Sequence, residues 1–226
     1  ENFNFAKIVN DHGFTFIGPK IEHIENMANK IKAKALAKQI GLPIIPGSEK
    51  NVESLKEAKK ISEKIGFPVI IKSTNGGGGR GIKIVHSENE LKKNLELARK
   101  EAEQSFGNNE VYIEKYIQNP RHIEIQIIGD NYGNIIHLGE RECSIQRRNQ
   151  KIVEECPSPV ITEDERKKIC NLTLEAMKKI KYFNLGTVEY LYKEGNFYFI
   201  EMNTRLQVEH TITEQVYNID IVKEQI

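Results

Sequence analysis

The segment LGTVEYLYKEGNFYFIEMN, Leu185–Asn203, places two apolar stretches on either side of Gly195, and this pattern predicts a β-hairpin. Glu189 and Glu201 are equally distant from Gly195, so the hairpin would set their carboxylates opposite each other. Opposed like charges destabilise a sheet unless a cation neutralises them. Asn203 lies on the same strand face as Glu201 and adds an amide oxygen. Taken alone, the hairpin fits equally a Mg²⁺ or Mn²⁺ ion held by these three side chains and a solvated pair of glutamates.

A strand with one polar face is expected further towards the N-terminus. Residues 121–128 place isoleucines at every second position, and the positions between them carry His122, Glu124 and Gln126. Strict alternation is typical of a strand that buries one face. We therefore expect the polar face of this strand to line a site.

Capping-box patterns mark the starts of two helices. Ser87 with Glu90 opens one helix that runs to residue 102, and Thr162 with Glu165 opens another that runs to residue 180. In such a box the hydroxyl and the carboxylate each accept a hydrogen bond from a free backbone N–H at the helix start. Both helices are therefore predicted to begin with a full cap.

A smaller unit is expected between residues 44 and 115. The apolar residues over 52–65 recur at helical spacing beneath a charged surface, which predicts a helix in addition to the one that begins after Ser87. Three short strands are predicted by apolar runs at residues 68–71, 82–85 and 111–113. Two helices and about three strands suit a small lid domain.

A glycine loop, Gly76–Gly81, contains the pattern G-x-G-x-x-G, whose backbone N–H groups can approach phosphate oxygens. It fits neither a dinucleotide fold nor a P-loop, because a strand pattern follows and Gly81 precedes Ile82-Lys83. The plain alternative is a flexible hairpin tip. Lys72, however, ends the preceding apolar strand beside the loop, where a polyphosphate would match its charge. Loop and lysine together favour a nucleotide site, and with it the metal interpretation of the hairpin.

The composition bears on partners and compartment. Lys plus Arg number 33 and Asp plus Glu 32 in 226 residues, with signs interspersed, so neither nucleic acid nor a membrane is an expected partner. Cys143, Cys156 and Cys170 form no disulfide or zinc pattern, which favours a reducing compartment. No apolar run approaches the roughly 20 residues that a bilayer requires, and no signal pattern opens the sequence. We expect a cytoplasmic protein, or a mitochondrial-matrix protein if it is eukaryotic.

Both ends of the sequence carry secondary-structure patterns. Residues 3–10 predict a helix, residues 14–17 a strand, and residues 220–226 another helix. Because the first and last helices look cut, we expect a fragment of a longer polypeptide.

The segment FIEMNTRLQVEH, Phe199–His210, resembles the ATP-grasp core of biotin-dependent carboxylases. The resemblance implies an α+β, ATP-grasp fold. Residues 1–43 would be the end of an N-terminal α/β lobe with its connecting helices, and residues 44–116 a small α/β lid subdomain hinged near Pro46-Gly47 and Lys115-Tyr116. Residues 117–226 would be a catalytic subdomain with a larger mixed or antiparallel sheet, its C-terminal part missing. The resemblance extends through residues 16–20, 69–72, 76–81, 114–116, 120–122 and 146–148.

The resemblance also implies roles for individual residues. Glu209 would act as general base and Arg205 would stabilise the anionic biotin ureido group, with Lys151 as the third catalytic residue. Bicarbonate would be bound by Lys151, Arg205, Gln207, Val208 and Glu209, and the divalent metal by Glu189, Glu201 and Asn203. ATP would be bound by Lys30, Lys72, Gly78, Gly79, Glu114, Lys115, Tyr116, Ile117, His122, Gln146, Glu189 and Glu201.

The implied reaction is the ATP- and bicarbonate-dependent carboxylation of biotin through carboxyphosphate. Its implied partners are bicarbonate, a biotinylated carrier domain and a carboxyltransferase subunit, within a homo-oligomer or a larger carboxylase complex. Residues 144–151 look most like propionyl-CoA carboxylase α subunits, so the expected acceptor is propionyl-CoA or acetyl-CoA. The sequence departs from the family pattern at Asn149, where most members have His, and at Thr211, where most have Pro.

Three other functions compete with this interpretation. Another ATP-grasp ligase, one that activates a carboxylate as an acyl phosphate and transfers it to an amine or thiol, would lack the bicarbonate residues but share Lys72, Glu189, Glu201 and Asn203. A silent nucleotide-binding module would be expected to lack Glu209 or Arg205, and both are present. A protein kinase is set aside because the sequence has no H-R-D or D-F-G motif.

Overall fold

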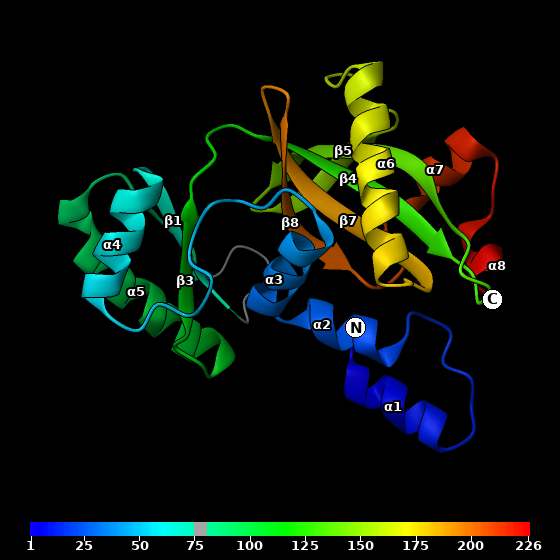
Figure 1. Cartoon of the computed structure of the whole chain (residues 1–226), viewed down its shortest axis with the longest axis horizontal. Helices are drawn as coiled ribbons and strands as arrows, with labels where there is room; N and C mark the ends of the chain where they lie inside the picture. Colours follow the sequence, from blue (N-terminus) through cyan, green and yellow to red (C-terminus); the bar gives the residue numbers. More distant parts are fainter. Residues whose placement is uncertain (75–80) are drawn as a thin grey trace.

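The structure is a computed structural model that describes residues 1–74 and 81–226. Its helices and two antiparallel sheets give an α+β fold, as predicted (Figure 1). The helices are α1 Phe3–Asp11, α2 Ile21–Ala28, α3 Lys30–Ile40, α4 Leu55–Ile65, α5 Glu88–Phe106, α6 Glu163–Lys179, α7 His210–Tyr217 and α8 Ile221–Gln225. The strands are β1 Val69–Ser73, β2 Lys83–Val85, β3 Val111–Lys115, β4 Arg121–Gly129, β5 Ile135–Arg147, β6 Gln150–Glu155, β7 Asn184–Lys193 and β8 Asn196–Asn203.

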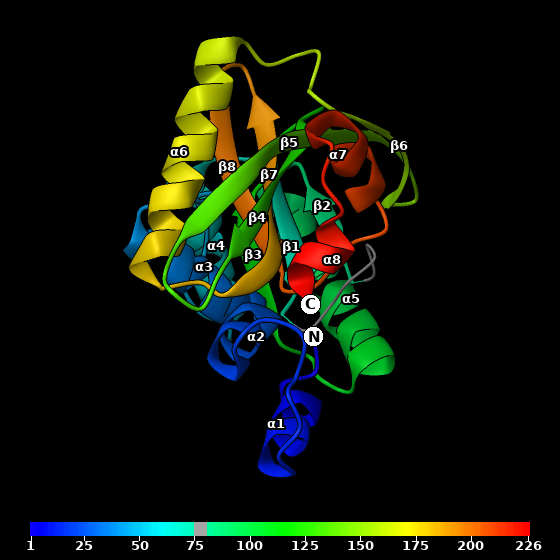
Figure 2. The same cartoon turned by 90° about the vertical axis from the view of Figure 1, so that its right-hand side faces the viewer.

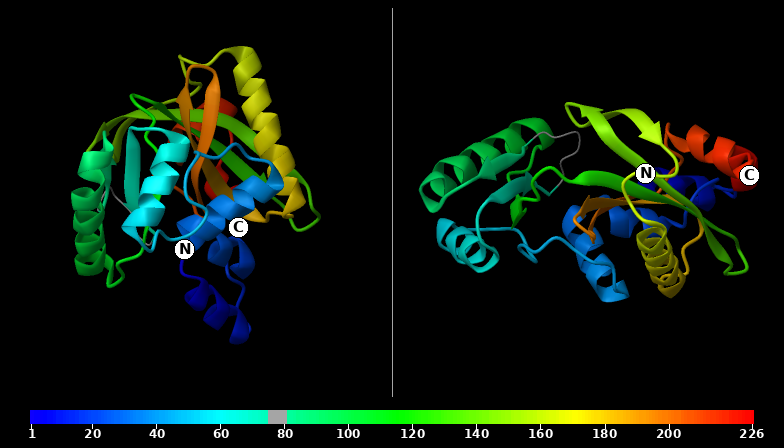
Figure 3. Two further views of the ribbon diagram at one scale, coloured as in Figure 1. Left: turned by 60° about the vertical axis from the view of Figure 1, so that its left-hand side comes forward. Right: turned by 90° about the horizontal axis from the view of Figure 1, so that it is seen from above.

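The small sheet has the order β2-β1-β3 and packs against α4 and α5. Apolar side chains from both helices and all three strands form a core of their own, among them Ala58, Ile71 and Leu91. Figure 3 shows this unit to one side of the large sheet in both views. The predicted two helices and three strands are therefore confirmed.

The two chain segments that connect the small unit to the rest lie against each other. The backbone N–H of Lys115 donates to the carbonyl of Pro46 (2.8 Å), and Gly47 forms an isolated bridge with Glu114. A Cβ on Gly47 would lie 2.3 Å from the carbonyl oxygen of Ile113, so only glycine fits this approach. The two segments predicted to form a hinge thus lie against each other, and the hinge itself stays a prediction.

The large sheet has the order β6-β5-β4-β7-β8. Ile123, Ile125 and Ile127 of β4 are fully buried in a core shared with α3 and α6, as the alternation predicts. Figure 2 shows α6 on one side of this sheet and α7 on the other. The polar face of β4 therefore looks away from the apolar core and towards the α7 side.

The predicted β7–β8 hairpin is present, but its turn is not centred on Gly195. Lys193 pairs with Asn196, so the turn is the two-residue Glu194-Gly195, both with positive φ (49° and 81°). An extra residue at Ile200, a β-bulge, then shifts the register by one. Glu189 and Glu201 are directly opposite, as predicted, because the bulge compensates for a turn centred half a residue before Gly195.

Two local predictions are wrong. Residues 14–17 form no strand: no described strand pairs with their backbone, and the N–H of Phe16 donates instead to the side chain of Asn10 (3.3 Å). Ser87 makes no side-chain cap for α5, although Glu90 does accept the N–H of His86 (3.0 Å). The box at Thr162 and Glu165 is complete.

Among the described helices, none is both long and apolar enough to cross a bilayer.

The two helix starts provide a matched stability test. Thr162→Ala is expected to lower the free energy of unfolding by about 1 kcal/mol, since it removes a cap that the N–H of Glu165 uses. Ser87→Ala should change it by less than about 0.5 kcal/mol, because that hydroxyl caps nothing. Urea unfolding of both variants measures the difference, and equal losses would contradict it.

Candidate active site

A row of charged side chains crosses the polar face of the large sheet. Glu124 on β4 is paired with Arg141 on β5 and with Glu189 on β7, and Glu189 is paired with Glu201 on β8. Directly opposed residues in antiparallel strands point to the same side. One guanidinium and three carboxylates therefore lie in line on one face, and three of the four side chains are buried.

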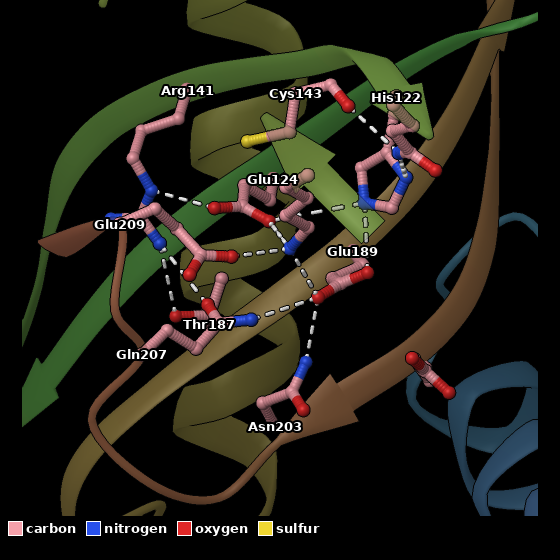
Figure 4. Close-up of polar contacts among 12 residues, drawn as sticks. His122, Glu124, Arg141, Cys143, Thr187, Glu189, Asn203, Gln207 and Glu209 are labelled. Atoms are coloured by element: carbon pink, nitrogen blue, oxygen red, sulfur yellow. Dashed lines mark hydrogen bonds and ion pairs between the residues drawn. The ribbon is translucent and has the colours of Figure 1, made fainter. Parts of the chain in front are cut away.

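Figure 4 shows Glu124, Glu189 and Glu209 close together, and Lys151 of β6 donates to all three carboxylates. Its Nζ contacts Glu124 and lies 2.9 Å from Glu189 Oε1 and 2.6 Å from Glu209 Oε1. Burial lowers the pKa of Lys151, but the carboxylates of Glu124 and Glu189 outweigh it and raise the pKa above its usual range. The ammonium is therefore held charged among three carboxylates.

Glu189 is the acceptor on which most donors converge. Burial raises the pKa of Glu189, but His122 and Lys151 outweigh burial and hold that pKa well below its usual range. Its Oε1 accepts from Lys151, from Asn203 Nδ2 (2.7 Å) and from Gln207 Nε2 (2.9 Å). Glu189 is therefore ionised and buried. It lies at the centre of a cluster of polar side chains that also contains Glu124, Lys151, Gln207 and Glu209.

His122 and Gln146, which the resemblance implies bind ATP, lie together. His122 Nε2 is 2.8 Å from Glu189 Oε2, and Gln146 Nε2 is 3.2 Å from His122 Nδ1. Gln146 is itself held by the carbonyl of Cys143 (2.7 Å). These contacts place an imidazole at the edge of the carboxylate row.

Among the described residues, two sets of side chains offer a divalent metal mainly oxygen ligands, and a third, Glu124, Cys143 and Glu209, includes a thiol. The predicted set has Glu189 and Glu201 on one sheet face, but Asn203 presents its amide nitrogen to Glu189 and its oxygen to Arg205 (3.2 Å). That amide would have to turn over to offer the metal its oxygen. The second set, His122, Glu124 and Glu189, has ligand atoms within 4.8 Å of one another. Both sets are dominated by the carboxylate oxygens that Mg²⁺ and Mn²⁺ prefer.

The lysines predicted to hold phosphates are paired with carboxylates. Lys30, at the start of α3, lies 3.4 Å from Glu201, and Lys72 on β1 lies 2.9 Å from Glu114. Lys34 of α3 binds the other oxygen of Glu114 at 2.7 Å. Burial raises the pKa of Glu114, but Lys72 and Lys34 together lower it below its usual range. Glu114 thus links the small unit to helix α3.

The other residues predicted to bind ATP differ in availability. The Nζ of Lys115 donates to the carbonyls of Gly66 (3.0 Å) and Phe67 (2.9 Å), so its side chain already holds a turn. Tyr116 and Ile117 are half-buried in the link to β4. Gly78 and Gly79 lie outside the described residues.

The predicted bicarbonate residues are only partly brought together. Lys151, Gln207 and Glu209 all contact the cluster, as their hydrogen bonds show. Arg205 lies at its edge, half-exposed, and pairs with Glu1 at 2.9 Å. The side chain of Val208 is 90% exposed and points away, so any contact from this residue would come from its backbone.

The chain is similar in sequence and structure to known proteins. Residues 29–226 match the family model described as the carbamoyl-phosphate synthase L chain, ATP binding domain. The chain belongs to this family. Solved structures of biotin carboxylase domains match 99% of this chain.

Three similar proteins show how close the match is. A pyruvate carboxylase of Staphylococcus aureus is 52% identical over the whole chain, which covers 20% of that protein. A biotin carboxylase of Allochromatium vinosum is also 52% identical, and the chain covers 51% of it. The crystal structure of the Hydrogenobacter thermophilus 2-oxoglutarate carboxylase biotin carboxylase domain dimer, with MgADP, ADP and bicarbonate, superposes with a TM-score of 0.94 at 50% identity, matching 50% of that chain.

These matches confirm the predicted resemblance to the ATP-grasp core of biotin-dependent carboxylases and the fold that it implied. The chain spans about half the length of the biotin carboxylase and about a fifth of the pyruvate carboxylase. The roles of individual residues stay predictions.

Proposed function

We propose that this chain is the ATP-binding catalytic core of a biotin carboxylase, which carboxylates biotin at the expense of MgATP and bicarbonate. The observation that carries the proposal is the contact of Lys151 with both Glu209 and Glu189. It joins the proposed bicarbonate base to the proposed metal and phosphate residues. Such a junction is where an oxygen of bicarbonate would meet the γ-phosphate.

Glu209 is proposed to take the proton of bicarbonate as an oxygen of that anion attacks the γ-phosphorus and ADP leaves. Burial raises the pKa of Glu209, but the hydrogen bond from Lys151, a backbone hydrogen bond and the charges of Lys151 and Arg141 together outweigh burial and lower the pKa, so the carboxylate is ionised at neutral pH. Once Lys151 turns to the bound anion, Glu209 regains its basicity. The product of this step is carboxyphosphate.

Carboxyphosphate would then break into CO₂ and phosphate, the phosphate would take the N1′ proton of biotin, and biotin would add to CO₂. Arg205 is proposed to stabilise the anionic ureido group, which its half-exposed position at the edge of the cluster permits. Mg²⁺ or Mn²⁺ bound by Glu189, Glu201 and Asn203 would offset phosphate charge. Lys30 and Lys72 would exchange their carboxylate partners for the phosphates of ATP.

The small unit is proposed to close over the nucleotide and exclude water from the intermediate. The adjoining segments at Gly47 and Lys115 would be its hinge. The proposed partners are a biotinylated carrier domain and a carboxyltransferase subunit, in a homo-oligomer or larger complex located in the cytoplasm. The acceptor proposed from residues 144–151 is propionyl-CoA or acetyl-CoA.

Steady-state ATP hydrolysis by the full-length protein tests the proposal. With Mg²⁺ present, turnover should require bicarbonate, rise when free biotin is added, and stop when the metal is chelated. Turnover that is indifferent to bicarbonate but depends on another carboxylic acid would contradict the proposal and indicate a different ATP-grasp ligase.

A further inference from the structure

Arg141 is a buried arginine for which the proposed chemistry has no role. Its side chain is 1% exposed, in the middle of β5, at one end of the carboxylate row. Each of its three nitrogens donates, and five hydrogen bonds use all five N–H groups. The acceptors are Glu124 Oε1 (2.6 Å), Gln126 Oε1 (2.8 Å), Thr213 Oγ1 (2.9 Å), Thr187 Oγ1 (3.3 Å) and Gln207 Oε1 (3.2 Å).

A guanidinium with every N–H occupied cannot also bind a substrate without losing a hydrogen bond. Arg141 therefore acts on chemistry only through the groups that it holds. Two of its acceptors, Glu124 and Gln126, lie on the same strand and are already fixed by the sheet. The other three acceptors lie on different elements. Two of them, Gln207 and Thr213, lie on either side of Glu209 in the sequence.

The contact with Gln207 fixes which way its amide points. A guanidinium only donates, so the amide oxygen of Gln207 must face Arg141. The amide nitrogen then faces the cluster, where it donates to Glu189. A bound anion needs N–H donors, and a turned amide would offer it an oxygen lone pair instead.

The contact with Thr213 fixes the segment itself. Thr213 is fully buried on α7, and Glu209 occupies the residue immediately before that helix. Residues 204–209 connect β8 to α7 and contain Gln207. Arg141 thus holds the segment at Gln207 and, through Thr213, at the helix that follows.

We propose that Arg141 is a positioning residue for the anion site: it sets the amide of Gln207 with its N–H groups towards bicarbonate and anchors α7 so that Glu209 stays beside Lys151. The inference rests on the proposed function, because bicarbonate is the anion concerned. It predicts a defect in bicarbonate affinity that ATP affinity does not share.

Arg141→Lys keeps a cation beside Glu124 but has too few donors, in the wrong geometry, to hold Gln207 and Thr213 as well. In the full-length protein, the KM for bicarbonate should rise about tenfold or more, while the KM for ATP should change by less than about threefold. A residue that merely supports the fold would change both or neither.

Two buried threonines provide a test that preserves the arginine. Thr213→Val and Thr187→Val each remove one acceptor of Arg141 and keep a β-branched shape, but only Thr213 lies on α7. Thr213→Val should raise the KM for bicarbonate severalfold, and Thr187→Val should leave it near the wild-type value. This pair decides the matter if Arg141→Lys fails to fold.

The outcomes separate the two proposals. If wild-type turnover requires bicarbonate and the variants show the split in KM, the positioning role is supported. If turnover requires bicarbonate but both KM values change together, or the two threonine variants behave alike, the role of Arg141 is refuted and the proposed function stands. If wild-type turnover ignores bicarbonate, the proposed function fails and the inference fails with it.

Discussion

Glu209→Gln is expected to lower bicarbonate-dependent ATP turnover by about 10²–10⁴-fold, the usual contribution of a general base. The amide keeps the size of the side chain and can still contact Lys151, but it cannot accept the proton of bicarbonate. Glu209 is on the segment before α7 and its carboxylate lies 2.6 Å from Lys151 Nζ. Turnover should fall while ATP binding, measured by calorimetry, stays within about threefold of the wild type.

The matched control is Glu175→Gln on the exposed face of α6, a residue that, among those the structure describes, forms an ion pair only with Lys178. It should leave turnover unchanged. A Glu209→Gln protein that hydrolyses ATP at the wild-type rate in bicarbonate would remove Glu209 from the mechanism.

Lys151→Met should both abolish turnover and destabilise the fold, with a loss of about 3–5 kcal/mol in the free energy of unfolding. The change removes a buried cation from Glu124, Glu189 and Glu209 and leaves three carboxylates close together. Lys178→Met, which breaks an exposed pair with Glu175, should cost less than about 1 kcal/mol. Urea unfolding at neutral pH measures both.

The pH dependence checks the cause of this loss. Glu189 and Glu209 have folded pKa values below the ordinary 4.5, so their contribution to stability is present above pH 4.5 and is lost as pH falls towards their folded values. Lys151 has a folded pKa above 10.5, so its contribution is present below pH 10.5 and is lost as pH rises beyond it. The difference between wild type and Lys151→Met should therefore be large at neutral pH and shrink in acid, as the carboxylates become protonated. A difference that does not change in acid would show that electrostatics is not the cause.

Much of the fold could be predicted because it follows from local patterns. The alternation of residues 121–128 determines which face of β4 joins the apolar core, and the apolar runs of the small unit define its three strands. The bulge at Ile200 could not be predicted, since an extra residue in one strand leaves no mark in the alternation of its partner. Residues 14–17 have strand composition, but a strand forms only where a partner lies beside it.

The site was only partly predictable for a similar reason. Opposition of Glu189 and Glu201 follows from a short hairpin, whereas the contact between Lys151 and Glu209 joins residues 58 positions apart and was expected only from the family resemblance. Glu124 was expected to line a site, but its pairing with Arg141 was not. Three consecutive charged residues, Glu140-Arg141-Glu142, suggest an exposed strand. All three side chains are nevertheless buried, because each has hydrogen-bond partners on other elements.

The most direct test of the central claim follows an oxygen atom from bicarbonate to phosphate. If the full-length protein forms carboxyphosphate, ATP turnover in freshly dissolved ¹⁸O-labelled bicarbonate should place one labelled oxygen in each phosphate released, because the attacking oxygen stays on phosphorus when CO₂ departs. Mass spectrometry of the phosphate measures this. Phosphate that carries oxygen from water alone would contradict the account, since it would mean that water, and not bicarbonate, attacks the γ-phosphate.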